Sequence, residues 1–137
     1  MRRFMILMVA LSTVLSSCKK MEINRIERNL SEGEWFIYSF IENGKDQTDS
    51  GYSEYVFRFD KEGKVAARIQ TLGVSVHGTW EVKKSDDKEV VLALNMNYPL
   101  QNLSETWNVT DENKRSIVLN CTSSKGYEKQ MVFNPVE

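Results

Sequence analysis

Few side chains in this chain have the types and spacing that catalysis or metal binding requires. His77 is the only histidine among the 137 residues, and it alternates with apolar neighbours, so we expect it to point into solvent. A hydrolase relay or a zinc site needs more partners than this. Residues 46–51 have the start of a calcium loop, but Phe57 stands where that loop needs its glutamate. The residues therefore predict no enzyme, no bound metal and no cofactor.

Cys18 has a different chemistry, because it follows a segment with the plan of an export signal. Arg2 and Arg3 give a positive start, and residues 4–15 form an apolar run interrupted only by two hydroxyl side chains. This run is shorter than the roughly 20 residues that a bilayer-spanning helix needs. A short charged region followed by a short apolar region is typical of a secretory signal peptide.

The four residues Leu15-Ser16-Ser17-Cys18 resemble the lipobox of bacterial lipoproteins. That resemblance implies that the Cys18 thiol carries a diacylglycerol with palmitate-type chains, that the leader is cut before it, and that the new amino terminus is acylated. Two or three acyl chains, at roughly 0.8 kcal/mol per buried methylene, hold a protein firmly on a membrane. We therefore expect residues 1–17 to be a lipoprotein signal peptide and the mature protein to be lipid-anchored in the outer membrane. The alternative is a plain signal peptide with a chance cysteine.

The residues after Cys18 bear on which side of the membrane the protein faces. Lys19-Lys20 resembles the mature starts of lipoproteins from Bacteroidota, and residue 19 is not the aspartate that retains enteric lipoproteins in the inner membrane. Surface export in Bacteroidota is associated with acidic residues just after the cysteine, and here Glu22 is the only acidic residue in the first few positions. The periplasmic face and the cell surface both remain open.

Composition describes an ordinary single domain. Removal of the leader leaves 120 of the 137 residues, and the whole chain is 41% apolar and 27% charged. The formal net charge of −1 falls to near −3 without Arg2 and Arg3, so no basic face for nucleic acid is expected. Cys121 is then the one cysteine without an assigned use. We expect it to be a small buried hydrophobic side chain, with a reactive thiol as the alternative.

The hydrophobic pattern changes along the mature chain. In residues 18–32, Ile23, Ile26 and Leu30 are spaced by three and four, which indicates a tether or short helix. In residues 33–137, apolar and polar residues alternate with period two, which indicates antiparallel strands with one solvent-exposed face. We expect eight strands, at residues 34–41, 53–60, 64–71, 73–82, 88–95, 104–110, 115–121 and 127–134.

Short polar turns join most of these strands, and no long crossover occurs. Eight sequential strands predict an all-β up-and-down antiparallel barrel, with a two-sheet sandwich as the alternative. The long loops 42–52 and 96–103 would share one end. The other end would hold Trp35, Trp80 and Trp107 as a floor. The first strand is apolar on both faces, with Trp35, Ile37 and Ile41 on one side and Phe36, Tyr38 and Phe40 on the other, so we expect both faces to be covered.

Three short motifs carry a family resemblance. Gly33-Glu34-Trp35 resembles the Gly-x-Trp at the start of the first lipocalin strand, and Thr110-Asp111 stands where lipocalins often have Thr-Asp-Tyr. Gly78-Thr79-Trp80 resembles a Gly-x-Trp of the lipocalin-like lipoproteins of Bacteroidota. The lipocalin arginine near the last strand has no evident counterpart, although Arg115 falls at the same predicted end. The resemblance implies a cup-shaped barrel that binds a small apolar or amphipathic molecule, with Gly33 and the three tryptophans as structural floor residues.

Two functions fit this pattern. In the first, a ligand occupies the open end of the cup without being transformed, and a long loop carrying Tyr98 closes over it. In the second, the interior is filled by its own side chains, and the barrel docks an envelope protein or a glycan. An open interior cavity would favour the first, and a filled interior with an exposed apolar patch the second. The side chains predicted to line the pocket are Ile41, Tyr55, Ile69, Val74, Leu94, Cys121 and Tyr127, together with Tyr98.

Overall fold

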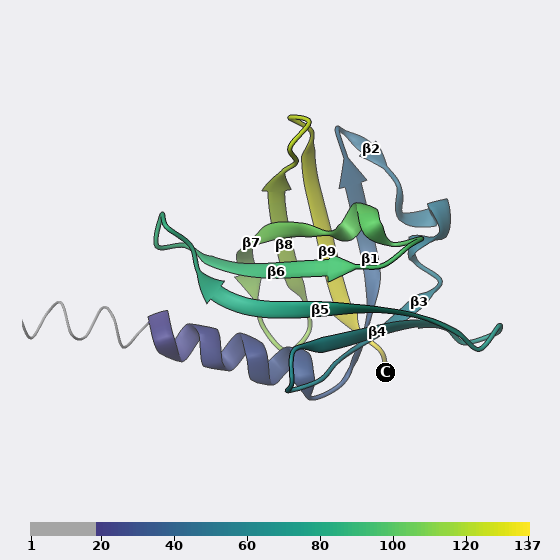
Figure 1. Cartoon of the computed structure of the whole chain (residues 1–137), viewed down its shortest axis with the longest axis horizontal. Coiled ribbons are helices and arrows are strands. Elements are labelled where there is room, and N and C mark those ends of the chain that lie inside the picture. The colour runs from purple at the N-terminus through teal and green to yellow at the C-terminus, as the bar shows by residue number, and fades with distance from the viewer. Residues whose placement is uncertain (1–18) are drawn as a thin grey trace, which may run out of the picture.

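The computed structural model describes residues 19–137, so the predicted leader and the predicted lipid attachment at Cys18 lie outside the described residues. A helix over residues 19–31 precedes an all-β domain (Figure 1). All eight predicted strands are present, and a short strand is added in the first long loop. The strands are β1 (Glu34–Glu42), β2 (Lys45–Asp46), β3 (Tyr55–Phe59), β4 (Lys64–Ile69), β5 (Val74–Lys84), β6 (Val90–Met96), β7 (Glu105–Glu112), β8 (Ile117–Thr122) and β9 (Glu128–Pro135), with short helical turns η1 (Thr48–Tyr52) and η2 (Gln101–Leu103).

The sheet closes on itself. The strand order is β2-β1-β3-β4-β5-β6-β7-β8-β9, and β1 also pairs with β9. Every pairing is antiparallel, so the eight long strands form an up-and-down barrel and the predicted barrel is confirmed over the sandwich. Alternating strand direction puts the connections 43–54, 70–73, 97–104 and 123–127 at one end, which we call the rim. The short turns between the other strands lie at the opposite end with the N-terminal helix, and we call this the helix end.

Aromatic rings fill the barrel interior. Phe57, Phe59 and Phe133 are essentially inaccessible to solvent and pack together, with ring centroids 5.1 Å apart for Phe57–Phe133 and 5.8 Å apart for Phe59–Phe133. Trp80 stands edge-on to Phe59, with ring centroids 5.4 Å apart. Offset and edge-to-face pairs of this kind add stability beyond the area they bury. Period-two alternation has therefore produced a packed core.

The N-terminal helix packs against the barrel at the helix end and closes it. Ile26 and Leu30 are fully buried in the same core cluster as the barrel residues. The Leu30 carbonyl accepts a 3.1 Å hydrogen bond from Trp35 Nε1 at the start of β1. The Glu112 carboxylate at the end of β7 accepts hydrogen bonds from Asn29 Nδ2 and from Arg25 Nε, the latter 2.9 Å long. Packing and polar contacts together fix the helix to the barrel.

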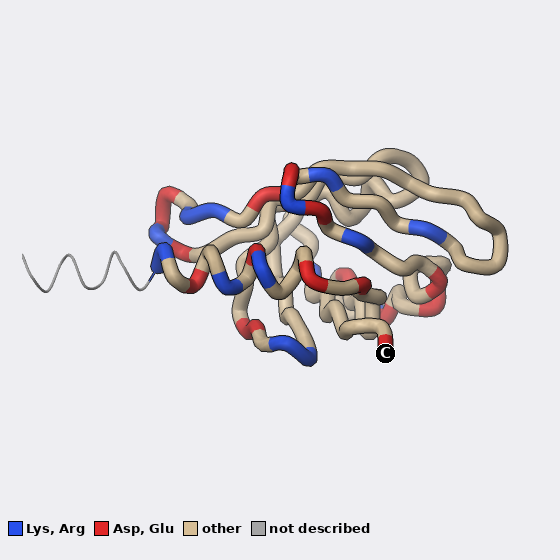
Figure 2. Tube along the Cα trace, turned by 90° about the horizontal axis from the view of Figure 1, so that it is seen from below, with Lys and Arg blue, Asp and Glu red and all other residues tan. Residues whose placement is uncertain are grey.

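Basic and acidic residues are interleaved along this helix (Figure 2), and Lys20, Arg25, Glu27 and Arg28 are exposed. This is the usual pattern for a helix that buries one stripe and solvates the rest. Within residues 19–137, no helix is both long enough and apolar enough to cross a membrane.

A β-bulge in β1 corrects one detail of the predicted strand pattern. The pairing of β1 with β9 shifts between Ile37 and Ser39, because one extra residue enters β1 there. Phe40 therefore joins Trp35 and Ile37 inside the barrel, and Ile41 moves to the outer face. Tyr38, at the bulge, is 62% exposed. The prediction of strict alternation through β1, with both faces covered, was wrong beyond Ile37.

The first long loop folds back to close a gap beside β1. β1 pairs with β3 only over its first three residues, and η1 covers the space beyond. The Phe40 amide donates to Thr48 Oγ1 at 2.8 Å, and that hydroxyl donates to Asp46 Oδ1 at 2.6 Å. This hydrogen bond, followed by one from the Thr48 amide, lowers the pKa of Asp46. The loop is thus tied to the rim by short-range contacts.

Candidate binding site at the barrel rim

A buried lysine connects four parts of the rim. Lys129 of β9 is only 5% exposed. Its Nζ donates to the backbone oxygen of Asn102 at 2.8 Å and to Asn102 Oδ1 at 2.9 Å. It also lies 2.9 Å from Glu105 Oε2 and 3.5 Å from Glu42 Oε2. An ammonium group has three protons to donate, and these contacts satisfy it fully. β9, η2, β7 and β1 are thereby joined at one point.

Strand alternation explains why these charges meet. Lys129 is two residues before the buried Met131, and Glu105 is two residues before the buried Trp107, so both point inward. After the bulge in β1, Glu42 shares the inward phase of Phe40. Each charged side chain is the last inward position of its strand before the rim. The inward positions of these strands are therefore apolar in the core and charged at the rim, where the interior meets solvent and the charged side chains form ion pairs.

A polar pocket of about 270 Å³ lies over this cluster. Glu42, Glu105 and Lys129 contribute to its wall, and the side chains of the two carboxylates are 23% and 21% exposed. The other lining residues come from η2 and from the turn between β8 and β9: Gln101, Asn102, Ser123, Ser124, Lys125 and Tyr127. We call this hollow the rim pocket. Among residues 19–137, no three His, Cys, Asp or Glu side chains are grouped as a metal ion would need.

Cys121 is half-buried beside the rim pocket and pairs with Lys129 across β8 and β9. Burial raises the pKa of its thiol to about 11, and the negative charge of Glu105 acts in the same direction, whereas Lys129 lowers it. The thiol is therefore protonated near neutral pH. Since the thiolate is the nucleophile, Cys121 is poorly suited to reaction there and serves as a small packing residue.

The eight side chains predicted to line an interior pocket do not surround one cavity. Tyr55 and Leu94 are buried in the core, and Ile69 and Cys121 pack against it. Ile41 lies on the outer face because of the β1 bulge. Val74 and Tyr98 are exposed, the latter by 82%. Tyr127, which is 43% exposed, is the member of this set that lines the rim pocket.

The tryptophans divide between the two ends of the barrel. Trp35 contacts the N-terminal helix, and Trp80 shares a hollow with it, so both lie at the helix end as predicted. Trp107 does not, since its Nε1 donates to the Leu103 carbonyl of η2 at 3.0 Å and its ring packs against Phe40. The reason is that β7 continues through a bulge to Glu112, which leaves Trp107 in the rim half of its strand. Gly33 sits at the helix end with open space around the position of a Cβ.

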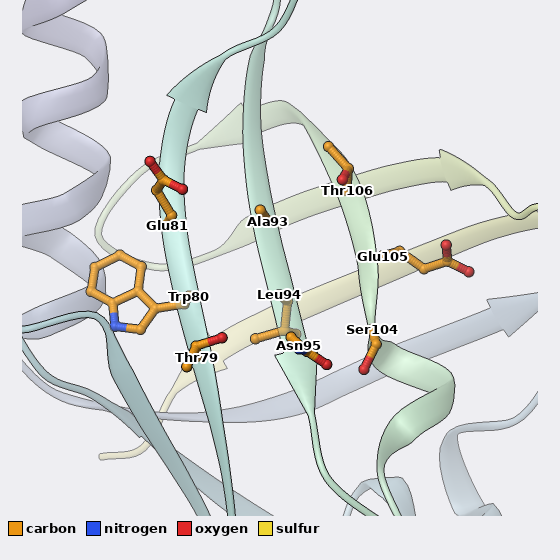
Figure 3. Close-up of a pocket in the computed structure, with 9 residues that line it drawn as sticks. All are labelled: Thr79, Trp80, Glu81, Ala93, Leu94, Asn95, Ser104, Glu105 and Thr106. Carbon is orange, nitrogen blue, oxygen red and sulfur yellow. The ribbon is translucent and has the colours of Figure 1, made fainter.

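Two further hollows lie on the outer surface. A groove of about 520 Å³ crosses β5, β6 and β7, and its outward side chains include Thr79, Asn95 and Thr106 (Figure 3). In that view the indole of Trp80 points away from the groove towards the N-terminal helix. A second groove, of about 580 Å³, includes apolar Phe36 and Leu72. Among residues 19–137, the lining of neither groove includes a buried charged side chain comparable to Lys129.

The rim cluster was missed from sequence, although a signal for it exists. Glu105 and Lys129 occupy inward phases at the end of the barrel that receives the long loops. Opposite charges at two such positions are a partial signal for a contact over β8, but the contact also depends on how β7, β8 and β9 are aligned. The comparison of this chain with protein-family models, with curated proteins and with solved structures found no match in any of the three.

Proposed function

We propose that this protein is a lipid-anchored protein of the bacterial outer membrane that binds its ligand at the barrel rim and catalyses no reaction. The observation that carries the proposal is the rim pocket, a polar hollow whose wall includes the buried Lys129 ammonium. The lipid anchor rests on the residues around Cys18.

The packed interior favours the second of the two functions considered from the sequence. The rings of Phe57, Phe59 and Phe133 occupy the space in which an apolar ligand would lie. Above them, the Lys129 ion pairs and Leu103 separate this core from the rim. An apolar ligand that entered here would bury the carboxylates of Glu42 and Glu105 without water, which is costly. Binding at the rim requires no such step.

The rim site can be tested by blocking it. Protein purified from the membranes of its own host should show, in native mass spectrometry, a non-covalently bound mass in addition to its own. We expect Ser124→Trp, which places a large ring in the rim pocket, to abolish this addition. Thr79→Trp, which places the same ring in the outer groove on β5, is the matched control and should retain it.

Two outcomes would contradict the rim site. One is recovery of the wild-type protein at its bare mass only. The other is an added mass that survives Ser124→Trp, because that ligand would have to lie elsewhere.

The anchor has its own test. Replacement Cys18→Ser removes the thiol that the lipobox would acylate, so incorporation of radiolabelled palmitate into the protein should fall to background. Cys121→Ser is the control and should leave labelling unchanged. Label that persists in Cys18→Ser would refute the lipid anchor and leave the rim site standing.

A further inference from the structure

We infer that the rim pocket takes a single neutral sugar residue; this rests on the proposed function and names its ligand class. The first argument is charge. The charged side chains lining the pocket are Glu42, Glu105, Lys125 and Lys129, two of each sign. An anionic ligand would meet the two carboxylates, and a cationic ligand would compete with two ammonium groups. A neutral ligand meets neither obstacle.

The second argument is hydrogen bonding. Lys129 contacts Oε2 of both Glu42 and Glu105, while the two side chains stay 23% and 21% exposed, so each carboxylate can still accept from a hydroxyl donor in the pocket. Hydrogen bonds from a hydroxyl to a carboxylate are among the stronger ones in proteins. The Gln101 amide and the Ser124 hydroxyl add groups that both donate and accept. A ligand with several hydroxyl groups matches this lining.

The third argument is shape. Tyr127 offers a partly exposed ring at the pocket wall, with an apolar face and a polar tip. A sugar ring has an apolar C–H face and a hydroxylated edge, so it can stack on that ring while its hydroxyl groups reach the carboxylates. The volume of about 270 Å³ lies just below the usual range for ligand pockets, which suits one ring better than a long chain.

The test compares two exposed tyrosines. Saturation-transfer NMR on the purified intact protein, with glucose, galactose, mannose and N-acetylglucosamine as separate probes, should show binding of at least one. We expect Tyr127→Ala to weaken that binding roughly tenfold or more, because stacking is lost. Tyr38→Ala removes the same side chain from the outer face of β1 and should leave affinity unchanged. Ser124→Trp should abolish binding, and glucuronate should bind more weakly than glucose.

The outcomes separate the two proposals. If no neutral sugar binds, or if glucuronate binds more tightly, the ligand class is wrong, while an added mass still abolished by Ser124→Trp keeps the rim as the binding site. If Tyr127→Ala and Tyr38→Ala weaken sugar binding equally, the pocket is not where the sugar binds. If the added mass also survives Ser124→Trp, both proposals fail.

Discussion

Unfolding of a Lys129→Met protein is expected to cost about 3 kcal/mol less free energy than unfolding of the wild type. Methionine keeps an apolar stem of similar length but removes the ammonium group, so Asn102, Glu105 and Glu42 lose their shared donor. Removing one partner of a fully buried ion pair costs roughly 3–5 kcal/mol. Because both carboxylates keep about a fifth of their surface in solvent, we expect the lower end of that range.

Urea denaturation measures this loss, with the slope of the transition used to check that the unfolded state is unchanged. Lys125→Met is the matched control, since Lys125 lines the same pocket but is exposed, and it should change stability by less than about 0.5 kcal/mol. A double-mutant cycle with Glu105→Gln should show a coupling energy above about 1 kcal/mol. A loss below about 1 kcal/mol in Lys129→Met would mean that the ion pairs do not hold the rim together.

Gly78→Ala is the second substitution with a large expected effect, again about 3 kcal/mol of lost stability. A Cβ at Gly78 would lie 2.2 Å from the Asn95 carbonyl oxygen and 2.7 Å from Met96 Sδ. The methionine sulfur can move, but the carbonyl belongs to the β6 backbone, and Gly78 pairs with Met96 in the β5–β6 ladder. The two strands would have to separate locally to admit one methyl group.

Gly33→Ala is the natural comparison, because Gly33 begins the other Gly-x-Trp motif. In the part of the chain that the structure describes, nothing lies within 4 Å of a Cβ at Gly33, and its backbone does not need a left-handed conformation. Alanine there should be neutral or stabilising by up to roughly 1 kcal/mol, since it restricts the unfolded chain. Thermal unfolding of the two variants side by side checks the contrast. If the two variants are destabilised equally, the close approach of β6 to Gly78 is not the cause of the stability lost in Gly78→Ala.

The strands of this barrel could be predicted because the alternation of apolar and polar residues within each strand reflects which face of that strand is buried. Alternation within β3, β4 and β5 depends only on which face meets the core, and glycine in the tight turn at Gly63 marks where the chain reverses. Closure into a barrel followed from the loop lengths, which place the long connections at one end. Signals of this kind can be read from the sequence without knowing which strands are aligned with each other.

The rim could not be predicted in the same way, because it depends on how strands are aligned across the barrel. The bulge after Ile37 adds one residue to β1, and nothing in the local sequence marks it, yet it decides that Glu42 points inward and Ile41 outward. Lys129 alone is typical of the solvated end of a strand. Its burial becomes visible only when β7 and β9, which flank β8, are aligned and η2 is placed next to Lys129.

The helix that plugs the barrel also determines how the protein would stand on a bilayer. Within the described residues it covers residues 19–31, and it is already buried in the barrel at Ile26. Ile26 is eight residues after Cys18, which corresponds to about 12 Å along a helix, so a lipid on Cys18 would lie close to the core. The bilayer would then face the helix side of the molecule, and the rim connections such as 70–73 lie on the far side (Figure 1). If Cys18 carries the proposed lipid, the anchor would hold the helix side of the molecule towards the membrane and the rim away from it.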